Sequence, residues 1–415
     1  MTILTMLGTG NYERSTYQWG ERSFETALFP EALAEWFPGS DVCILATSGA
    51  RRKHGETMLA AVPSARFIDI PDGATEEELW RMFQIISEAV PEGSAVLLDI
   101  THGFRSLFSL ALLALAFLRV AKDIDLCGVV YGNYEARNRE TNTSPVFDIT
   151  PLVALLDGAI ATDRFLKTGD ARPLSVALGR PGVRSAASIT KHLALLSEGL
   201  LAGRVGEVQN EADKLLTSLH SALESGAFAG AKGPYKLLER RLSDTYGPLR
   251  SGPSGGPDGE LLAMLRFIEW YAENGHLLHA SALAREWCVS LRCWKIGDDF
   301  HIAEKRRQHE DWIGAAVKLS RSNDVTISAE WVELVRQADW VQGLRNDLAH
   351  FKDERKSKTI RAAVAALPER LRRLGAALGL AGCQPAADVG AADALVCADA
   401  DHKRLDFTRE VRGDG

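Results

Sequence analysis

Short apolar runs alternate with amphipathic segments over the first 150 residues. The runs are four to six residues long and rich in β-branched side chains, as is typical of buried parallel strands, and they cover residues 3–7, 42–47, 67–70, 95–100 and 126–131. A helical period lies between them at residues 24–36, 76–90 and 104–121. The alternation predicts a Rossmann-like α/β domain with a mainly parallel sheet, which residues 146–149 extend as a last antiparallel or edge strand.

From residue 151 onward the apolar positions follow the 3.6-residue period of helices, at 152–166, 192–201, 207–223, 261–272, 277–291 and 332–350. The pattern predicts that the rest of the chain is all-α. A stretch rich in glycine and proline at 250–259 interrupts it, and we expect an exposed loop there. The predicted organisation is therefore an α/β domain at 1–150, a helical connecting region at 151–259, a helical domain at 260–382 and a tail at 383–415.

Composition places the chain among ordinary globular proteins. Its 415 residues exceed the usual size of one hydrophobic core, and 46% are hydrophobic and 25% charged. The N-terminus lacks a basic segment followed by an apolar run, and the most apolar stretch, at 107–118, is shorter than the roughly 20 residues that span a bilayer. We therefore expect a cytoplasmic protein without a membrane anchor.

Cysteines and charge refine this picture. Six cysteines occur without a CxxC pair, which argues against both a zinc site and a disulfide framework. The net charge of −7 is unfavourable for nucleic acid binding, but residues 300–380 hold 15 Lys/Arg against 11 Asp/Glu, a local charge of +4. A basic surface can therefore exist on this acidic chain.

Three loops at the carboxyl ends of the predicted strands carry phosphate-binding chemistry. Glycines let backbone N–H groups approach an oxyanion, and hydroxyls and helix N-termini add donors and partial positive charge. The candidate ligand contacts are Gly8, Thr9, Gly10, Asn11, Thr47, Ser48, Thr101, His102, Gly103, Phe104 and Arg105. The alternative is that these are ordinary βα turns, which use the same residues as helix caps. Glu13 stands where a dinucleotide fingerprint needs its third glycine, which argues against NAD or FAD.

His102 and the neighbouring arginines each allow more than one interpretation. At the start of a helix, His102 could donate to a phosphate, act as a base on the ligand or be a capped surface residue. Arg105 lies one turn into the same helix and could point away from the crevice. Arg51 and Arg52 could equally be solvated.

Near the C-terminus, Arg345-Asn346-Asp347-Leu348-Ala349-His350 forms an R-x4-H sequence within a helical pattern. Asn346 and His350, four residues apart, share a helix face, and only the long Arg345 side chain could reach round to them. One helix thus supplies half of a site, which two copies facing each other across a two-fold axis would complete. The alternative is a solvated helix face with an unrelated histidine.

Arg345, Asn346 and His350 suit metal-free cleavage of RNA. A group that titrates near neutral pH can assist removal of the 2′-hydroxyl proton, and an arginine can neutralise the charge that builds on the phosphate. The expected product is a 2′,3′-cyclic phosphate. The sequence shows no Asp, Glu and His cluster with metal-ligand spacing, so we expect neither a metal nor another cofactor. By contrast, His276, His279, the Arg285-Glu286 pair and the run 305–307 look like surface or capping residues.

Three motifs give the chain a resemblance to the CARF-HEPN ribonucleases of type III CRISPR systems. They are LGTGNY followed by Tyr17, DITHGFRS at 99–106 and RNDLAH at 345–350. The second resembles the D-x-T-H-G-F-R motif of one subgroup of CARF domains. The resemblance covers the first 150 residues and the last catalytic helix, and the helices between them carry no motif of the family.

The resemblance implies a homodimer, with higher oligomers open, whose CARF domains bind a cyclic oligoadenylate and activate HEPN domains that cleave single-stranded RNA. It favours a ring of four adenylates over one of six. It also implies that the glycine-rich and DITHGFRS loops contact the ligand and that Arg345, Asn346 and His350 catalyse cleavage. Two other functions stay open at this stage: a nucleotide-sensing regulator or adaptor without nuclease activity, and a nucleotide-dependent oxidoreductase.

Overall fold

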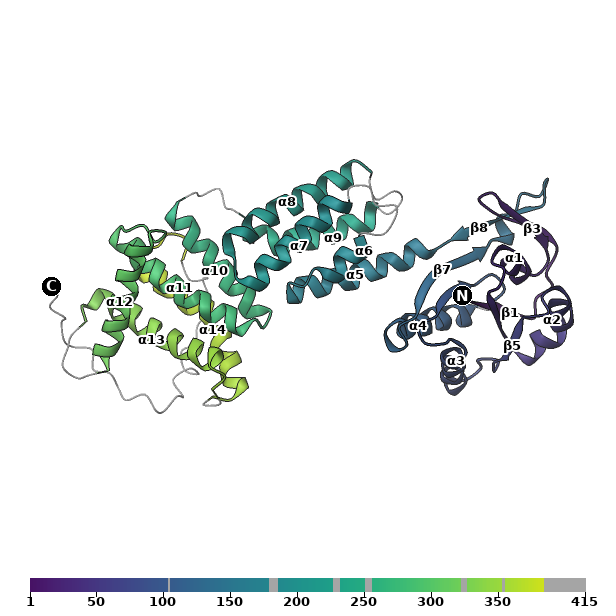
Figure 1. The fold of residues 1–415 in the computed structure, drawn as a ribbon, viewed down its shortest axis with the longest axis horizontal. Coiled ribbons are helices and arrows are strands. Elements are labelled where there is room, and N and C mark those ends of the chain that lie inside the picture. The colour runs from purple at the N-terminus through teal and green to yellow at the C-terminus, as the bar shows by residue number, and fades with distance from the viewer. Residues whose placement is uncertain are drawn as a thin grey trace. The chain divides into compact units, whose positions relative to one another are not determined.

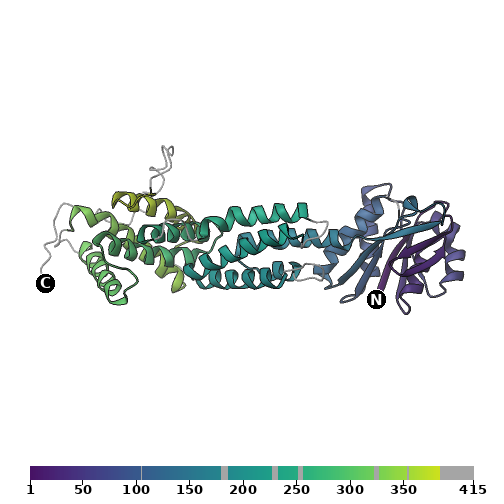
Figure 2. The same cartoon turned by 90° about the horizontal axis from the view of Figure 1, so that it is seen from above.

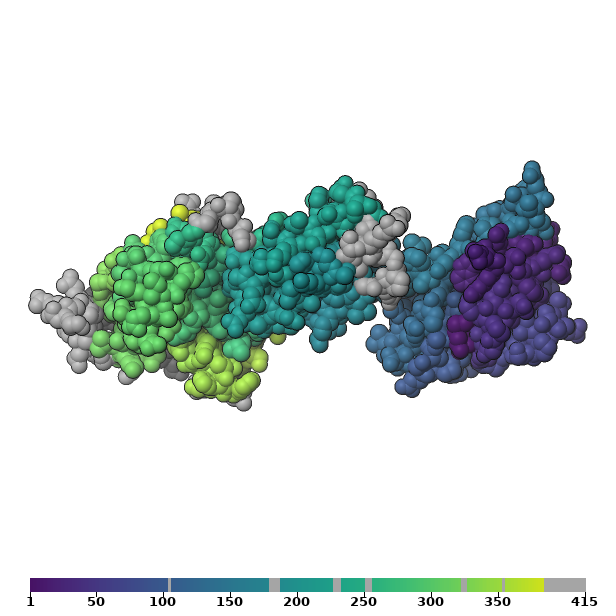
Figure 3. All heavy atoms as spheres, turned by 45° about the horizontal axis from the view of Figure 1, so that its top comes forward, coloured from purple at the N-terminus to yellow at the C-terminus, as the bar shows by residue number. Residues whose placement is uncertain are grey.

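The computed structural model describes residues 1–103, 105–178, 186–226, 232–250, 256–321, 327–352 and 355–383. The chain divides into two compact units, which are treated separately below: an N-terminal unit, Met1–Leu156, and a helical unit, Asp157–Gly415. In the space-filling view the first is purple to blue and the second teal to yellow (Figure 3). An α/β domain followed by a helical region is therefore confirmed, while the division at residue 259 stays a prediction.

The N-terminal unit is built on one eight-stranded sheet in the order β3-β2-β8-β7-β6-β1-β4-β5. Figure 1 labels β1, β3, β5, β7 and β8 of this sheet. The strands β7, β6, β1, β4 and β5 are parallel to one another, and β8 is antiparallel to β7. The strand bounds are β1 (Thr2–Leu7), β2 (Ser15–Trp19), β3 (Arg22–Thr26), β4 (Asp41–Ala46), β5 (Arg66–Asp69), β6 (Ala95–Asp99), β7 (Asp125–Gly132) and β8 (Thr143–Asp148). All five predicted parallel strands and the antiparallel one at 146–149 are confirmed.

Helices cover both faces of this sheet. Alternate residues of β1 divide between two cores: Ile3 and Leu7 pack with α1 (Phe29–Trp36) and α2 (Ser48–Ala61), whereas Leu4 and Met6 pack with α3 (Glu76–Ala89) and α4 (Arg105–Ala121). Because strands buried on both faces are apolar throughout, the parallel strands could be predicted from the sequence. Figure 2 shows the strands side by side in the purple and blue part of the chain.

One prediction for this unit is wrong in part, and one helix was missed. The helix expected at 24–36 begins only at Phe29, because residues 22–26 form β3, which pairs antiparallel with β2. The hairpin formed by these two strands extends the sheet through the parallel pairing of β2 with β8. The helix α2 was not predicted, and it buries only Ala50, Gly55 and Met58, so its apolar period is faint.

The helical unit consists of helices and one short 3₁₀ turn in its described residues. Its helices are α5 (Thr150–Thr168), which begins in the N-terminal unit, α6 (Arg172–Leu178), α7 (Ala186–Ala202), α8 (Val205–Glu224), α9 (Lys232–Tyr246), α10 (Pro257–Glu273), α11 (Leu277–Ile296), α12 (Ala303–Ser320), α13 (Ala329–Ala349) and α14 (Ser357–Ala377). The six predicted helical segments are confirmed, and α6, α9, α12 and α14 add to them.

A continuous hydrophobic core joins these helices. Helix α11 packs against α10, α12, α13 and α14, and Trp287 on α11 is fully buried with its indole N–H donating to the carbonyl of Leu261 at 2.9 Å. The Tyr271 hydroxyl on α10 donates to the carbonyl of Leu200 on α7 at 2.6 Å. Trp287 and Tyr271 thus satisfy their polar ends within the core, as buried packing anchors usually do.

Candidate functional site

The three predicted phosphate-binding loops meet at one edge of the sheet. Strands β6, β1 and β4 are adjacent and parallel, so the segments that follow them, 101–103, 8–11 and 47–48, lie together where these strands end. We call these residues the loop edge. Of the predicted contacts, Phe104 and the side chain of Arg105 lie outside the described residues.

Tyr12 connects two of the loops. Its hydroxyl accepts a hydrogen bond from the Gly8 amide at 3.0 Å and donates to the carbonyl of His102 at 3.3 Å. Burial raises the pKa of Tyr12 above its ordinary value, although hydrogen bonds from the backbone oppose this, so the hydroxyl keeps its proton. A side chain at Gly8 would place its Cβ 3.0 Å from the His102 carbonyl oxygen, which explains why glycine stands there.

A lysine and a histidine of α2 hold the first loop. The ammonium of Lys53 donates to the Thr9 carbonyl at 2.7 Å and to the Asn11 side-chain oxygen at 2.5 Å, and His54 Nε2 lies 2.9 Å from the Gly10 carbonyl. Neither residue was predicted from the sequence. The signal that could have found them is their position one turn into the helix that Thr47 caps.

The imidazole of His102 makes its contacts within the folded N-terminal unit. Its Nε2 accepts a hydrogen bond from the Phe29 amide at 3.0 Å, and its ring centroid lies 4.1 Å from that of Tyr12. Burial, with a smaller contribution from nearby His54, lowers the pKa of His102 to about 3, so the ring is neutral at physiological pH. In this structure the ring joins the loop after β6 to α1, and ligand contact by His102 stays a prediction.

Asp99 and Thr101 form a second fixed point at the end of β6. The fully buried carboxylate of Asp99 accepts from the Thr5 hydroxyl at 2.6 Å and from the Thr101 amide and hydroxyl at 2.8 and 2.6 Å. The Thr101 hydroxyl also accepts from the Gly132 amide on β7 at 2.8 Å. Burial raises the pKa of Asp99 to about 6, although the hydrogen bonds from Thr101 and Thr5 oppose the rise. Asp99 opens the DITHGFRS motif but was not among the predicted site residues; its signal is a carboxylate that closes an apolar strand.

The first turn of α2 is the clearest anion-attracting element of the loop edge. The Thr47 hydroxyl caps the helix by accepting from the Ala50 amide at 3.3 Å, and Ser48 is exposed at the first helical position. Arg51 forms an exposed ion pair with Asp69 at 2.7 Å. The helix N-terminus and the Lys53 ammonium therefore give the loop edge a local positive potential.

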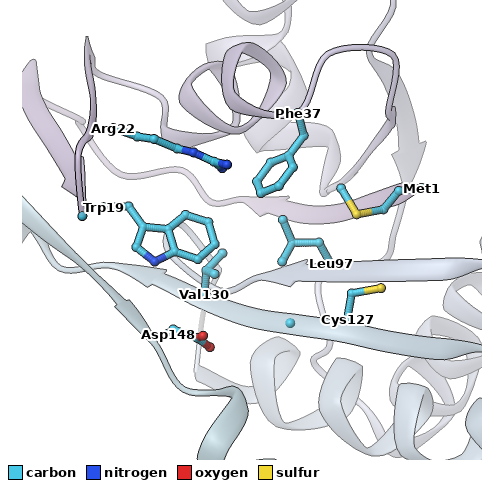
Figure 4. A pocket seen from close by; sticks show the side chains of 10 residues that line it. Met1, Trp19, Arg22, Phe37, Leu97, Cys127, Val130 and Asp148 are labelled. Atoms are coloured by element: carbon cyan, nitrogen blue, oxygen red, sulfur yellow. The ribbon is translucent and has the colours of Figure 1, made fainter. Parts of the chain in front are cut away.

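A pocket of about 460 Å³ lies at the opposite, amino-terminal edge of the parallel strands (Figure 4). The guanidinium carbon of Arg22 is 5.1 Å from the Phe37 ring centroid and 6.0 Å from that of Trp19. The residues that line the pocket are Met1, Trp19, Gly20, Arg22, Phe37, Leu97, Cys127, Gly128, Val130 and Asp148. None of the predicted site residues belongs to this pocket.

The predicted catalytic residues lie at the end of α13 in the helical unit. His350 is the C-cap residue and is exposed, and its amide donates the last helical hydrogen bond to the Asn346 carbonyl at 3.0 Å. Arg345 and Asn346 are half-buried, and Arg345 Nη1 donates to Asn346 Oδ1 at 3.2 Å. The end of this helix thus presents an accessible imidazole close to an ordered amide and a guanidinium.

A polar network adjoins this motif. Gln342 Nε2, one turn earlier on α13, donates to Asn346 Oδ1 at 3.1 Å, and Gln342 Oε1 accepts from Arg285 Nε on α11 at 3.3 Å. Arg285 also pairs with Glu286, which Arg306 of α12 contacts in turn. Arg285, Glu286 and Arg306, expected to be surface or capping residues, keep 34%, 37% and 23% of their side chains exposed and also join this network between helices.

Neither a metal-binding cluster nor a membrane-spanning helix occurs among the described residues. No group of three or more His, Cys, Asp and Glu side chains is arranged there to hold a metal ion. None of the helices described is long and apolar enough to cross a membrane.

Comparisons with known proteins give a limited set of similarities. No family model matches the chain. A CRISPR-associated protein of Methanocaldococcus jannaschii is 26% identical over 171 residues, which are 40% of this chain and 26% of that protein, so the chain matches about a quarter of this relative's length. Among solved structures, Enterococcus italicus Csm6 bound to cyclic hexa-2′-fluoro-hexa-dAMP aligns with a TM-score of 0.42 and 11% identity, over 91% of this chain and 94% of that one.

Proposed function

We propose that this protein is a cyclic oligoadenylate-activated, metal-independent endoribonuclease that cleaves single-stranded RNA in type III CRISPR defence. The observation that carries the proposal is the end of α13, where exposed His350 follows the Arg345–Asn346 pair. The similarity to a CRISPR-associated protein supports the cellular role. In this proposal the N-terminal unit is a CARF domain and residues 260–382 form a HEPN domain.

The proposed reaction is an internal transfer at phosphorus. The 2′-oxygen of a ribose forms a bond to the adjacent phosphorus while the bond from phosphorus to the 5′-oxygen breaks, which gives a 2′,3′-cyclic phosphate and a 5′-hydroxyl. One imidazole takes the 2′-proton and another gives a proton to the leaving oxygen, so a dimer in which two copies of His350 face each other supplies both. Arg345 stabilises the added negative charge on the phosphate oxygens.

For the activator, the loop edge fits a polyanion. The first turn of α2 and the Lys53 ammonium attract phosphates, and Ser48 is exposed beside them. A ring of adenylates spanning two copies of this edge would place phosphates against both. We propose Gly8, Thr9, Gly10, Asn11, Thr47, Ser48, Thr101, His102, Gly103, Phe104 and Arg105 as the contacts, and a ring of four adenylates in preference to six.

The decisive test is an RNA cleavage assay of the full-length protein with no ligand, cyclic tetra-adenylate or cyclic hexa-adenylate, in EDTA. We expect cleavage stimulated by the four-membered ring, products ending in 2′,3′-cyclic phosphate, and loss of cleavage in His350→Ala. Ligand binding without any cleavage by the wild-type protein would contradict the nuclease and favour an adaptor. Light scattering of the same samples measures whether the protein is a dimer.

A further inference from the structure

A line of polar side chains leads from α11 to the proposed catalytic residues. Arg285 Nε donates to Gln342 Oε1 at 3.3 Å, and Gln342 Nε2 donates to Asn346 Oδ1 at 3.1 Å. Arg345 Nη1 reaches the same Asn346 oxygen at 3.2 Å. Two amides are thus enclosed between two arginines.

The arginines determine which way both amides face. A guanidinium has five donors and no acceptor, so the Gln342 atom that meets Arg285 must be the oxygen. The NH₂ group of Gln342 then faces Asn346, and the Asn346 atom that meets it must also be the oxygen. Arg345 imposes the same orientation independently. The oxygen and nitrogen of these side chains are therefore assigned by chemistry, whereas those of an isolated amide are not.

This orientation leaves Asn346 as a donor. Its Oδ1 accepts two N–H groups, while its Nδ2 makes no hydrogen bond within the described part of the chain. The base of the network is fixed, because Arg285 pairs with Glu286 and lies 3.6 Å from Glu310 of α12. Burial alone would raise the pKa of Glu286, but hydrogen bonds from Arg306 and Arg285 outweigh it and lower the pKa, so this carboxylate stays charged.

We propose that Asn346 presents its side-chain N–H to a non-bridging oxygen of the scissile phosphate, and that Gln342 and Arg285 are positioning residues that hold it there. The proposal rests on the proposed ribonuclease function. Asn346 transfers no proton; it offers a neutral donor where negative charge grows in the transition state. An acceptor at the same place would repel the phosphate, so the direction of the amide decides whether Asn346 helps or hinders.

The test uses the activated full-length protein and two near-isosteric variants. In Asn346→Asp the side chain can still accept from Arg345 and Gln342 but has nothing to donate. In Gln342→Glu the side chain still accepts from Arg285, but a carboxylate oxygen now faces Asn346 and competes for its N–H, against the direction that Arg345 imposes. We expect kcat to fall by about a hundredfold in the first and about tenfold in the second, with KM changed less than threefold.

Gln337→Glu is the matched control. Gln337 also lies on α13 and accepts from an arginine, Arg370, at 3.0 Å, but it donates to Glu333 instead of Asn346. We expect it to keep kcat within threefold of wild type. An equal fall of kcat in Gln337→Glu and Gln342→Glu would overturn the proposal, because added charge on α13 would then explain both.

A sulfur substitution in the RNA tests whether Asn346 donates a hydrogen bond to the phosphate or only supports the local structure. Replacing one non-bridging oxygen with sulfur weakens the hydrogen bond it accepts, so the wild-type protein should cleave one phosphorothioate diastereomer more slowly. This difference should shrink in Asn346→Asp and Gln342→Glu. If Gln342→Glu does not fold, as judged by its thermal unfolding, Arg285→Met replaces it, since methionine cannot orient Gln342.

The outcomes distinguish this proposal from the function on which it rests. Wild-type cleavage that is lost in His350→Ala but unchanged in Asn346→Asp and Gln342→Glu would overturn the positioning proposal alone. No cleavage by the activated wild-type protein would overturn both.

Discussion

The two histidines that the sequence marks for function lie in opposite environments. His102 of the N-terminal unit is buried, accepts a hydrogen bond from the Phe29 amide and stays neutral because its pKa is lowered to about 3. His350 of the helical unit is exposed at the end of α13, and its ring makes no hydrogen bond within the described residues. Burial therefore separates a histidine that supports the fold from one that is available for chemistry.

The largest expected effect tests the accessible histidine. His350→Ala should lower ligand-activated RNA cleavage by about 10²–10⁴-fold, the usual contribution of a positioned acid or base. Because the side chain is exposed, the free energy of unfolding should change by less than about 0.5 kcal/mol. Cleavage rates and urea unfolding of the same preparation measure both. A large loss of stability would show that His350 supports the fold and would remove the contrast between the two histidines.

The buried histidine should show the reverse behaviour. His102→Ala leaves the buried Phe29 amide without its acceptor and opens a cavity beside Tyr12, so we expect a loss of about 2–4 kcal/mol in stability. Hydrogen exchange measures the loss locally, in β1, β6 and α1. His54→Ala is the control, since its ring lies in a less buried position on α2 and should cost less than about 1 kcal/mol. Equal losses in both variants would contradict the role given to His102.

His102 and Asp99, two buried residues that titrate separately, should change the stability of the N-terminal unit in opposite directions as the pH falls. The pKa of His102 is lowered from 6.5 to about 3, so its stabilisation is lost as the pH falls from about 6.5 towards 3. The pKa of Asp99 is raised from 3.8 to about 6, so its protonated form favours the folded state more strongly as the pH falls from about 6 to 4. Asp99→Asn should therefore make the N-terminal unit more sensitive to acid, by roughly 2–3 kcal/mol at pH 4 relative to pH 7.

Urea unfolding at a series of pH values measures this effect. The slope of stability against pH between 4 and 6 should rise in Asp99→Asn and fall in His102→Ala. An Asp99→Asn protein with the wild-type slope would show that Asp99 ionises with an ordinary pKa in the folded state.

The smallest expected effect concerns the hydroxyl that links the loops. Tyr12→Phe removes the acceptor of the Gly8 amide and the donor to the His102 carbonyl, while it keeps the aromatic contact with His102. We expect a loss of about 1 kcal/mol. Hydrogen exchange of the Gly8 amide should accelerate, with little change in the exchange of α13. An unchanged Gly8 amide would mean that the Tyr12 hydroxyl does not hold it.

The sequence predicts those parts of the fold in which apolar residues recur with an unambiguous period. Parallel strands buried on both faces form continuous apolar runs, and helices with one buried face show a 3.6-residue period. Helix α2 buries three small or flexible residues, and the β2–β3 hairpin mixes polar and apolar positions, so neither was predicted. These elements depend on contacts that arise only once the sheet has formed.

The site is predictable to a lesser degree. Spacing places Asn346 and His350 on one helix face. The network behind Asn346 includes Arg285, which contacts Gln342 across 57 positions of sequence through the packing of α11 against α13. In the N-terminal unit the loop sequences locate the edge, whereas Lys53 and Asp99 enter through side-chain contacts across strands and helices. A motif gives the residue types, and tertiary contacts decide which atoms remain accessible.

The contact of Lys53 with the first loop has a mechanical consequence. One ammonium bonds both the Thr9 backbone and the Asn11 side chain, and the next residue, His54, contacts Gly10. Any displacement of this loop must therefore pull on α2, a rod of 14 residues that is roughly 20 Å long. A movement that starts at the glycines is thereby coupled to a helix whose buried residues Ala50 and Met58 pack against the sheet.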